Sequence, residues 1–159
     1  SVISCFASHY SIWQKFATEE LGGLILEDDA ELVRAFNPSE LPQDSITLIG
    51  GAIHTPGAWS KEKGEFVDNH SFLELAKSFT PCLNQVKRSE MRFTGSMAYF
   101  VPPSCAKVWC AKVVAGKINA PDIFIGESGE VRYLMFPNPF RGDGECNEPV
   151  RQPKARSRS

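Results

Sequence analysis

Three consecutive carboxylates, Glu27, Asp28 and Asp29, stand at the end of a short apolar strand that we expect over residues 23–27. Neighbouring anions repel one another, and they are costly at the end of a buried strand unless water or a cation neutralises them. Hard oxygen ligands of this kind suit Mn²⁺ or Mg²⁺, particularly when a bound phosphate completes the coordination shell. Residue types alone leave a second interpretation open, in which Asp28 or Asp29 caps a following helix.

Length and composition indicate one globular domain with a basic tail. The chain has 159 residues, of which 42% are hydrophobic and 23% are charged, so it can form one domain with its own core. No apolar run approaches the ~20 residues that cross a bilayer, so no transmembrane segment is expected. No secretory signal pattern opens the sequence either. We expect an α/β domain over residues 1–150 and a basic, disordered tail over residues 151–159.

Charge and cysteine usage narrow the classes of function. The formal net charge is -2, and the basic tail leaves the remainder acidic, which argues against a nucleic-acid-binding domain. The five cysteines include no C-x-x-C pair, which fits neither a disulfide framework nor a tetrahedral zinc site. Cys105 and Cys110 lie in an apolar helical pattern, where a thiol behaves as a small hydrophobe. A reducing, cytoplasmic environment is the simplest interpretation.

Hydrophobic periodicity predicts helices and strands that alternate along the chain, which favours an α/β fold. Helices are predicted over residues 8–20 with Ser8 as cap, over 30–36, and from 102–104 to Gly116, with one or two helical turns at 72–76. Strands are predicted over residues 23–27, 46–49 and 131–136, with a strand or hairpin over 91–101 and a short apolar piece at 123–125. Residues 51–70 show no clear period, which is typical of a functional or mobile loop. Trp13 and Trp109 lie on apolar helix faces and are expected in the core.

A glycine pair at Gly50 and Gly51 follows the second predicted strand. In an α/β sheet, ligands collect at the carboxyl ends of the strands, and the acidic cluster and this glycine pair both occupy that place by sequence. Glycine has no side chain, so a ligand can approach its backbone closely. A plain turn explains the pair equally well. Together with the acidic cluster, the pattern favours a phosphate-bearing ligand held through a metal.

Several segments match, in order, a known family pattern. Residues 4–13 read SCFASHYSIW and resemble a Cys-x-x-Ser-His helix start, and residues 24–30 read LILEDDA, an apolar strand followed by Glu-Asp-Asp. Further matches are 48–50, 93–99 (FTGSMAY), 106–107, 121–122 and 136–137. Over residues 4–140 the chain thus resembles glycosyltransferase family 25, which includes lipooligosaccharide and collagen galactosyltransferases.

The resemblance implies a GT-A-like, Rossmann-type nucleotide-sugar transferase fold and a role in lipopolysaccharide biosynthesis. Glu27, Asp28 and Asp29 would then hold Mn²⁺ or Mg²⁺ against the diphosphate of a UDP-sugar, from which galactose or glucose passes to a saccharide or other hydroxyl acceptor. If transfer inverts the anomeric centre, Asp122 is the candidate base for the acceptor proton. The residues expected to bind donor or acceptor are His9, Gly50, Thr94, Gly95, Ser96 and Tyr99.

Some alternatives stay open at this stage. The Pro121-Asp122 pair also reads as a turn, and His9 also reads as a residue that orients the acidic turn. Family members usually have a strand and a helix ahead of the Cys-x-x-Ser-His segment, whereas this chain starts just before Cys5 and has Ser4 in place of the usual glycine. We therefore expect a fragment or a trimmed domain. The alternative function is a catalytically inactive transferase-like module that binds saccharide or a protein partner.

Overall fold

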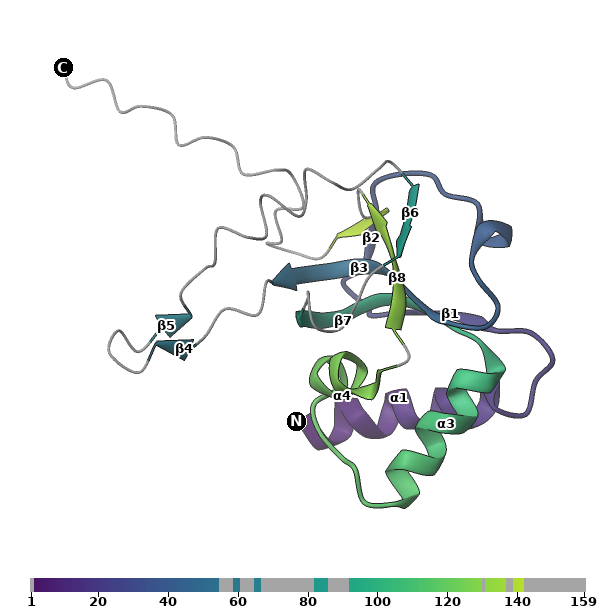
Figure 1. Cartoon of the computed structure of the whole chain (residues 1–159), viewed down its shortest axis with the longest axis vertical. Coiled ribbons are helices and arrows are strands. Elements are labelled where there is room, and N and C mark those ends of the chain that lie inside the picture. Colours follow the sequence, from purple (N-terminus) through teal and green to yellow (C-terminus); the bar gives the residue numbers. More distant parts are fainter. Residues whose placement is uncertain are drawn as a thin grey trace.

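The computed structural model describes residues 2–54, 59–60, 65–66, 82–85, 92–129, 131–136 and 139–141. Its helices are α1 (Val2–Phe16), α3 (Pro103–Val114) and α4 (Pro121–Ser128), with a short 3₁₀ helix at Pro38–Glu40. Its strands are β1 (Gly23–Leu26), β2 (Glu31–Leu32), β3 (Ile46–His54), β4 (Trp59–Ser60), β5 (Glu65–Phe66), β6 (Cys82–Gln85), β7 (Arg92–Val101), β8 (Val131–Phe136) and β9 (Phe140–Arg141). Figure 1 shows their arrangement.

A mixed sheet of seven strands forms the centre of the described structure. Five strands lie in the order β1-β7-β3-β8-β6, and the β2–β9 pair joins this sheet through β9 beside β3. The pairs β1–β7, β3–β7 and β6–β8 are antiparallel, whereas β3 runs parallel to β8 and β9. The predicted α/β class is confirmed, with a sheet that combines both kinds of pairing.

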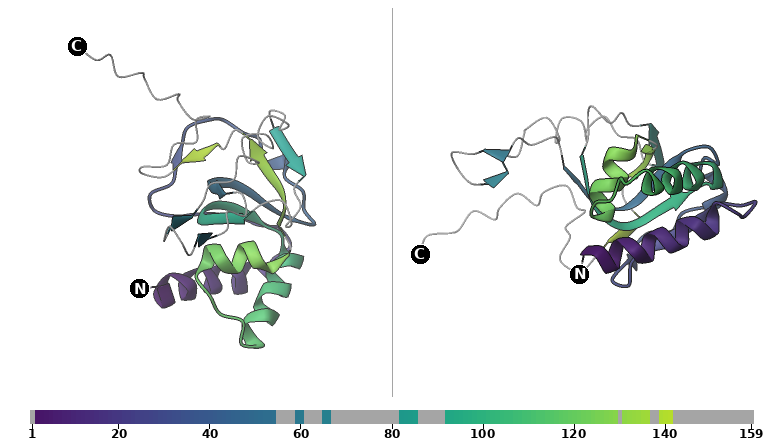
Figure 2. Two further views of the ribbon diagram at one scale, coloured as in Figure 1. Left: turned by 60° about the vertical axis from the view of Figure 1, so that its left-hand side comes forward. Right: turned by 90° about the horizontal axis from the view of Figure 1, so that it is seen from below.

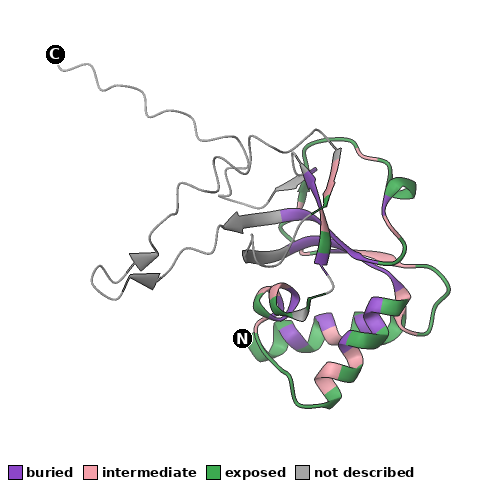
Figure 3. Cartoon of the chain, viewed as in Figure 1, coloured by how far each residue is buried: buried purple, intermediate pink, exposed green. Residues whose placement is uncertain are grey.

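Among the described residues, helices α1, α3 and α4 gather on one side of the sheet, as the left view of Figure 2 shows. Alternate residues of β7 point to opposite faces: Tyr99 and Val101 belong to the core beneath the helices, and Ala98 and Phe100 to a second core on the other face. Figure 3 shows buried residues along the central strands and on the inner faces of the helices. Both faces of the sheet are thus covered, and the helix-side core is the larger.

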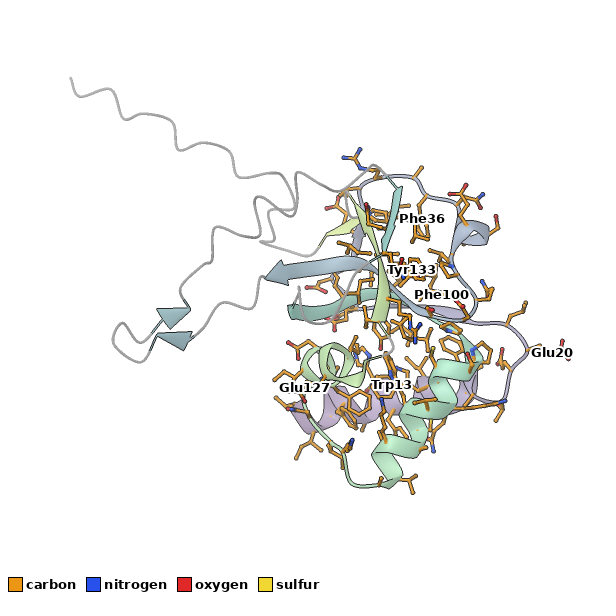
Figure 4. The ribbon with its side chains drawn as sticks, viewed as in Figure 1. Trp13, Glu20, Phe36, Phe100, Glu127 and Tyr133 are labelled. Atoms are coloured by element: carbon orange, nitrogen blue, oxygen red, sulfur yellow. The ribbon has the colours of Figure 1, made fainter. Side chains whose placement is uncertain are left out.

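Helix α1 contributes the aromatic centre of the helix-side core. Phe6, His9 and Trp13 are its buried residues, and their spacing places them on one face of a helix. Trp13 is 0% exposed and stacks on Phe124 with ring centroids 5.1 Å apart, while Trp109 approaches it edge-on at 4.8 Å. Figure 4 shows Trp13 between the helices and the sheet. The core positions predicted for both tryptophans are confirmed.

The predicted bounds of this helix, 8–20, were wrong at both ends. The helix already includes Val2, and Ser8 lies within it, where its hydroxyl donates to the carbonyl of Ser4 at 3.1 Å instead of capping the first turn. The helix ends at Phe16, and the chain passes through a glycine pair into β1. A Cβ on Gly22 would lie 2.7 Å from the carbonyl oxygen of Val101, so this glycine allows close approach of two backbone segments.

The helix predicted over residues 30–36 is absent. This segment forms β2, which pairs with β9, and the backbone N–H groups of Val33 and Arg34 donate to the carbonyl of Pro139 at 2.8 and 3.2 Å. Phe36 packs against the second core. A helix this short before Pro38 is marginal by propensity, so tertiary pairing with a distant segment decides its conformation.

Other predicted elements differ mainly in extent. The strand predicted at 46–49 continues to His54, and residues 92–101 form one strand with no hairpin turn. The apolar piece at 123–125 lies inside α4, where the N–H of Phe124 donates to the carbonyl of Ala120 at 2.8 Å. The elements predicted for residues 102–116 and 131–136 are confirmed. The helical turns predicted at 72–76 and the tail predicted at 151–159 lie outside the described residues. Among the described helices, none is long and apolar enough to span a membrane.

Candidate functional site

The acidic cluster occupies a tight turn at the end of the edge strand β1. The N–H of Glu27 donates to the carbonyl of Met97 at 2.8 Å, and the N–H of Ala30 donates to the carbonyl of Glu27 at 3.1 Å. This second bond closes a β-turn with Asp28 and Asp29 at its two central positions. No helix follows, so the interpretation of Asp28 or Asp29 as a helix cap is wrong.

The three carboxylates have different surroundings. Asp28 and Asp29 are exposed, whereas the side chain of Glu27 is 31% exposed and faces His9. Within the described ranges, the three candidate ligand groups whose atoms lie within 4.8 Å of one another belong to Cys5, His9 and Glu27. Asp28 and Asp29 are outside that group. The turn therefore offers two carboxylates to solvent and one to helix α1.

His9 connects the acidic turn to the buried core. It is 5% exposed, and its Nε2 lies 3.7 Å from Oε1 of Glu27. On the other side of the ring, Nδ1 lies 2.5 Å from the hydroxyl of Tyr99, which in turn lies 3.1 Å from Nε1 of Trp13. The His9 ring thus lies between the acidic turn and Tyr99, and its binding of donor or acceptor stays a prediction.

The hydrogen-bond pattern assigns the protons along this row of side chains. The indole N–H of Trp13 can only donate, so the hydroxyl oxygen of Tyr99 accepts. Burial, above all, raises the pKa of Tyr99 above its ordinary value, so its hydroxyl keeps its proton. The hydroxyl can donate this proton to Nδ1 of His9, while the other ring nitrogen, Nε2, faces Glu27. The core thus sets the orientation of the His9 ring.

Replacing Tyr99 by phenylalanine is expected to lower the free energy of unfolding by about 1–3 kcal/mol, because Trp13 and His9 both lose a buried partner. Urea denaturation followed by circular dichroism measures the change. The control is Tyr10→Phe, the same chemical change at a half-buried tyrosine of α1, which we expect within about 0.5 kcal/mol of the parent. Equal stability of the two variants would contradict a structural role for the Tyr99 hydroxyl.

Cys5 lies beside the acidic turn, and Asp122 lies on a separate helix. Cys5 is exposed on α1 one helical turn before His9, and Asp122 is half-buried in the first turn of α4. Partial burial raises the pKa of the Cys5 thiol, and the carboxylates of Glu27 and then Asp122 act in the same direction. Asp122 and Glu27 thus act on the same thiol, although 95 residues of sequence separate them.

Sequence reasoning missed Cys5 as a member of the site. Its four-residue spacing from His9, which places both on one face of a helix, is the signal that was available.

The other predicted site residues lie in the two central strands. Leu26 at the end of β1 and Gly50 in β3 both pair with Ala98 of β7. Gly50 is therefore level with the start of the acidic turn, and strand β7 lies between them. Gly50 is buried within β3 between β7 and β9, not at a strand end as predicted, and the β3–β7 register shifts beside it. Thr94, Gly95 and Ser96 belong to β7, but their side chains lie outside the described part of the structure. Tyr99 is 0% exposed, and its hydroxyl forms hydrogen bonds with His9 and Trp13.

A cavity of about 530 Å³ lies elsewhere, where α3 leads to α4, with Lys112, Lys117 and Glu127 among its lining residues. None of the predicted site residues lines it. Its polar, lysine-containing walls include none of the acidic groups that define the turn after β1.

Comparison with known proteins gives one match. The sequence model described as glycosyltransferase family 25 (LPS biosynthesis protein) matches residues 1–114. The matched range contains Cys5, His9, the acidic turn and Tyr99, and it ends before Asp122. No curated protein and no solved structure matches the chain.

Proposed function

The chain belongs to glycosyltransferase family 25, and from this premise we propose that it transfers galactose or glucose from a UDP-sugar to a saccharide or other hydroxyl acceptor, with Mn²⁺ or Mg²⁺ as cofactor. The observation that carries the proposal is the family match over residues 1–114, which includes the solvent-facing acidic turn. A GT-A-like arrangement of the sheet and helices is part of the same proposal.

The donor set of the turn fits a hard cation. Asp28 and Asp29 present carboxylate oxygens to solvent at the centre of a closed β-turn, and Glu27 lies beside them. Mn²⁺ and Mg²⁺ sites commonly combine one or two carboxylates with water and substrate phosphates, which an exposed turn allows. Asp28 and Asp29 would hold the ion, which when bound stabilises negative charge on the departing diphosphate.

The protein's own residues would position this turn and the acceptor. The Glu27 N–H donates to the Met97 carbonyl, and the His9 ring lies beside the Glu27 side chain, so the backbone of the turn would be orientated before donor binds. Asp122, whose carboxylate acts on the same thiol as Glu27, would accept the acceptor's hydroxyl proton. The acceptor oxygen would then attack the anomeric carbon from the face opposite the diphosphate.

Isothermal titration with UDP and Mn²⁺ tests the metal role of the turn. We expect Asp29→Ala to weaken UDP binding at least about tenfold, which corresponds to about 1.4 kcal/mol. The matched control is Glu20→Ala, which removes an exposed carboxylate before the start of β1, whereas the turn follows the end of this strand. Equal affinity in the parent and Asp29→Ala would remove the metal site from the proposal.

Assay of UDP release from UDP-galactose or UDP-glucose separates the enzyme from the inactive module. Release of UDP by the intact chain excludes the inactive module, because binding alone breaks no glycosidic bond. Saccharide binding without UDP release would favour that module.

A further inference from the structure

A second group of potential ligands lies on the helix side of the acidic turn. Cys5 and His9 are one turn apart on α1, and Glu27 approaches them from the end of β1. Their ligand atoms all lie within 4.8 Å of one another, and Nε2 of His9 is 3.7 Å from Oε1 of Glu27. Sulfur, imidazole nitrogen and carboxylate oxygen thus lie near one another, although they come from α1 and from the turn after β1.

The spacing of these atoms is close to that of a tetrahedral zinc site. Zinc bonds of about 2.0–2.3 Å place tetrahedral ligand atoms about 3.3–3.6 Å apart. The distance of 3.7 Å between His9 Nε2 and Glu27 Oε1 is close to this ligand–ligand distance. Cys5 is exposed on α1, where rotation of its side chain can bring the sulfur closer. Solvent then provides the remaining position.

A thiolate and an imidazole favour a different cation from the one proposed for the turn. Mg²⁺ and Mn²⁺ prefer oxygen ligands, whereas sulfur and nitrogen ligands suit Zn²⁺. The buried hydroxyl of Tyr99 contacts the far nitrogen of His9, which is the kind of contact that orients a zinc-binding histidine. The carboxylate of Glu27 places a negative charge beside Cys5 and His9, which attracts a cation.

We propose that Cys5, His9 and Glu27 form a binding site for Zn²⁺, distinct from the donor-metal site formed by Asp28 and Asp29. Binding releases the thiol proton of Cys5 to solvent. His9 binds the ion through Nε2, which then carries no proton, and the ring's one proton lies on Nδ1, which donates to the hydroxyl oxygen of Tyr99. The proposal goes beyond glycosyl transfer, because it concerns a second cation and needs no sugar nucleotide.

Cobalt titration of the full chain tests this site directly, because Co²⁺ replaces Zn²⁺ and a cobalt–thiolate bond absorbs in the near ultraviolet. We expect this absorption in the parent, its loss on addition of Zn²⁺, and its absence in Cys5→Ser. We also expect Cys5→Ser to weaken Zn²⁺ binding at least about 100-fold, since loss of an outer-sphere partner alone costs about 10–100-fold. Absence of the absorption in the parent, or its persistence in Cys5→Ser, would overturn the proposal.

Two controls keep the outcome unambiguous. Cys110→Ser removes a half-buried thiol of α3 and should keep the cobalt–thiolate absorption. Glu27→Gln should keep that absorption with weaker Zn²⁺ affinity, and it serves as the second variant if Cys5→Ser does not fold. Asp29→Ala should keep the cobalt–thiolate absorption of the parent, because Asp29 lies outside the Cys5, His9 and Glu27 group, so failure of the zinc site and failure of the donor-metal site are distinguishable.

Discussion

Replacement of Asp122 by asparagine is expected to lower UDP release from a UDP-sugar in the presence of acceptor by about 10²–10⁴-fold, the usual contribution of a general base. Asparagine keeps the shape of the side chain but cannot take a proton from the acceptor hydroxyl. Asp122 lies in the first turn of α4, where loss of its charge costs only about 0.3–1 kcal/mol of stability. The loss of activity would therefore report on chemistry and not on folding.

Glu127→Gln is the matched control for Asp122→Asn. Glu127 is an exposed carboxylate on the same helix, labelled in Figure 4, so the control makes the same chemical change in the same element. We expect its rate of UDP release to stay within about twofold of the parent, since Glu127 lies outside the proposed donor site. We expect UDP and Mn²⁺ to bind Asp122→Asn as they bind the parent. Equal rates for the two variants would contradict the role of Asp122 as base.

Replacement of Trp13 by alanine is expected to lower the free energy of unfolding by about 3–5 kcal/mol. The ring is 0% exposed, stacks on Phe124 and contacts Trp109, so alanine leaves a large cavity in the helix-side core. Its indole N–H also donates to Tyr99, and this bond is lost as well. Since a whole domain has only about 5–15 kcal/mol of stability, a substantial fraction of molecules could unfold at physiological temperature.

Urea denaturation followed by circular dichroism measures this loss without depending on tryptophan fluorescence. The control is Ile12→Ala, at the adjacent position of α1, where the side chain is 37% exposed. We expect this control to lose less than about 1 kcal/mol, because its surroundings can relax and part of its surface is already in water. A loss for Trp13→Ala no greater than that of Ile12→Ala would show that the aromatic cluster does not determine stability.

The local sequence pattern was sufficient to predict those helices and strands whose bounds are set by their own and adjacent residues. The residues of α3 read as a helix because Pro102 precedes it, Pro103 begins it and Gly116, with φ of +84°, follows it. The apolar strands β1 and β8 were recognised for a similar reason, since each is bounded by glycine or proline. The cores around Trp13 and Trp109 followed from their spacing on the helices.

Segments with weak local preference were decided by distant partners. Residues 31–32 form β2 because they pair with β9, and the N–H groups of Val33 and Arg34 donate to the carbonyl of Pro139. These partners lie more than 100 residues further along the sequence. The residue type of Ser8 suits a helix cap, but the preceding residues continue the helix. Intrinsic propensities for helix or strand differ by small free energies per residue, and the free energy gained from tertiary contacts is larger than these differences.

The same division applies to the candidate site. Glu27, Asp28 and Asp29 were found from the sequence, because three adjacent carboxylates after an apolar strand are visible without coordinates. Their arrangement required the fold: the β-turn directs Asp28 and Asp29 to solvent, whereas Glu27 meets His9 and Cys5 of α1. Residue identity determines which atoms can hold a cation or a proton, and only packing of α1 against β7 decides which of them meet.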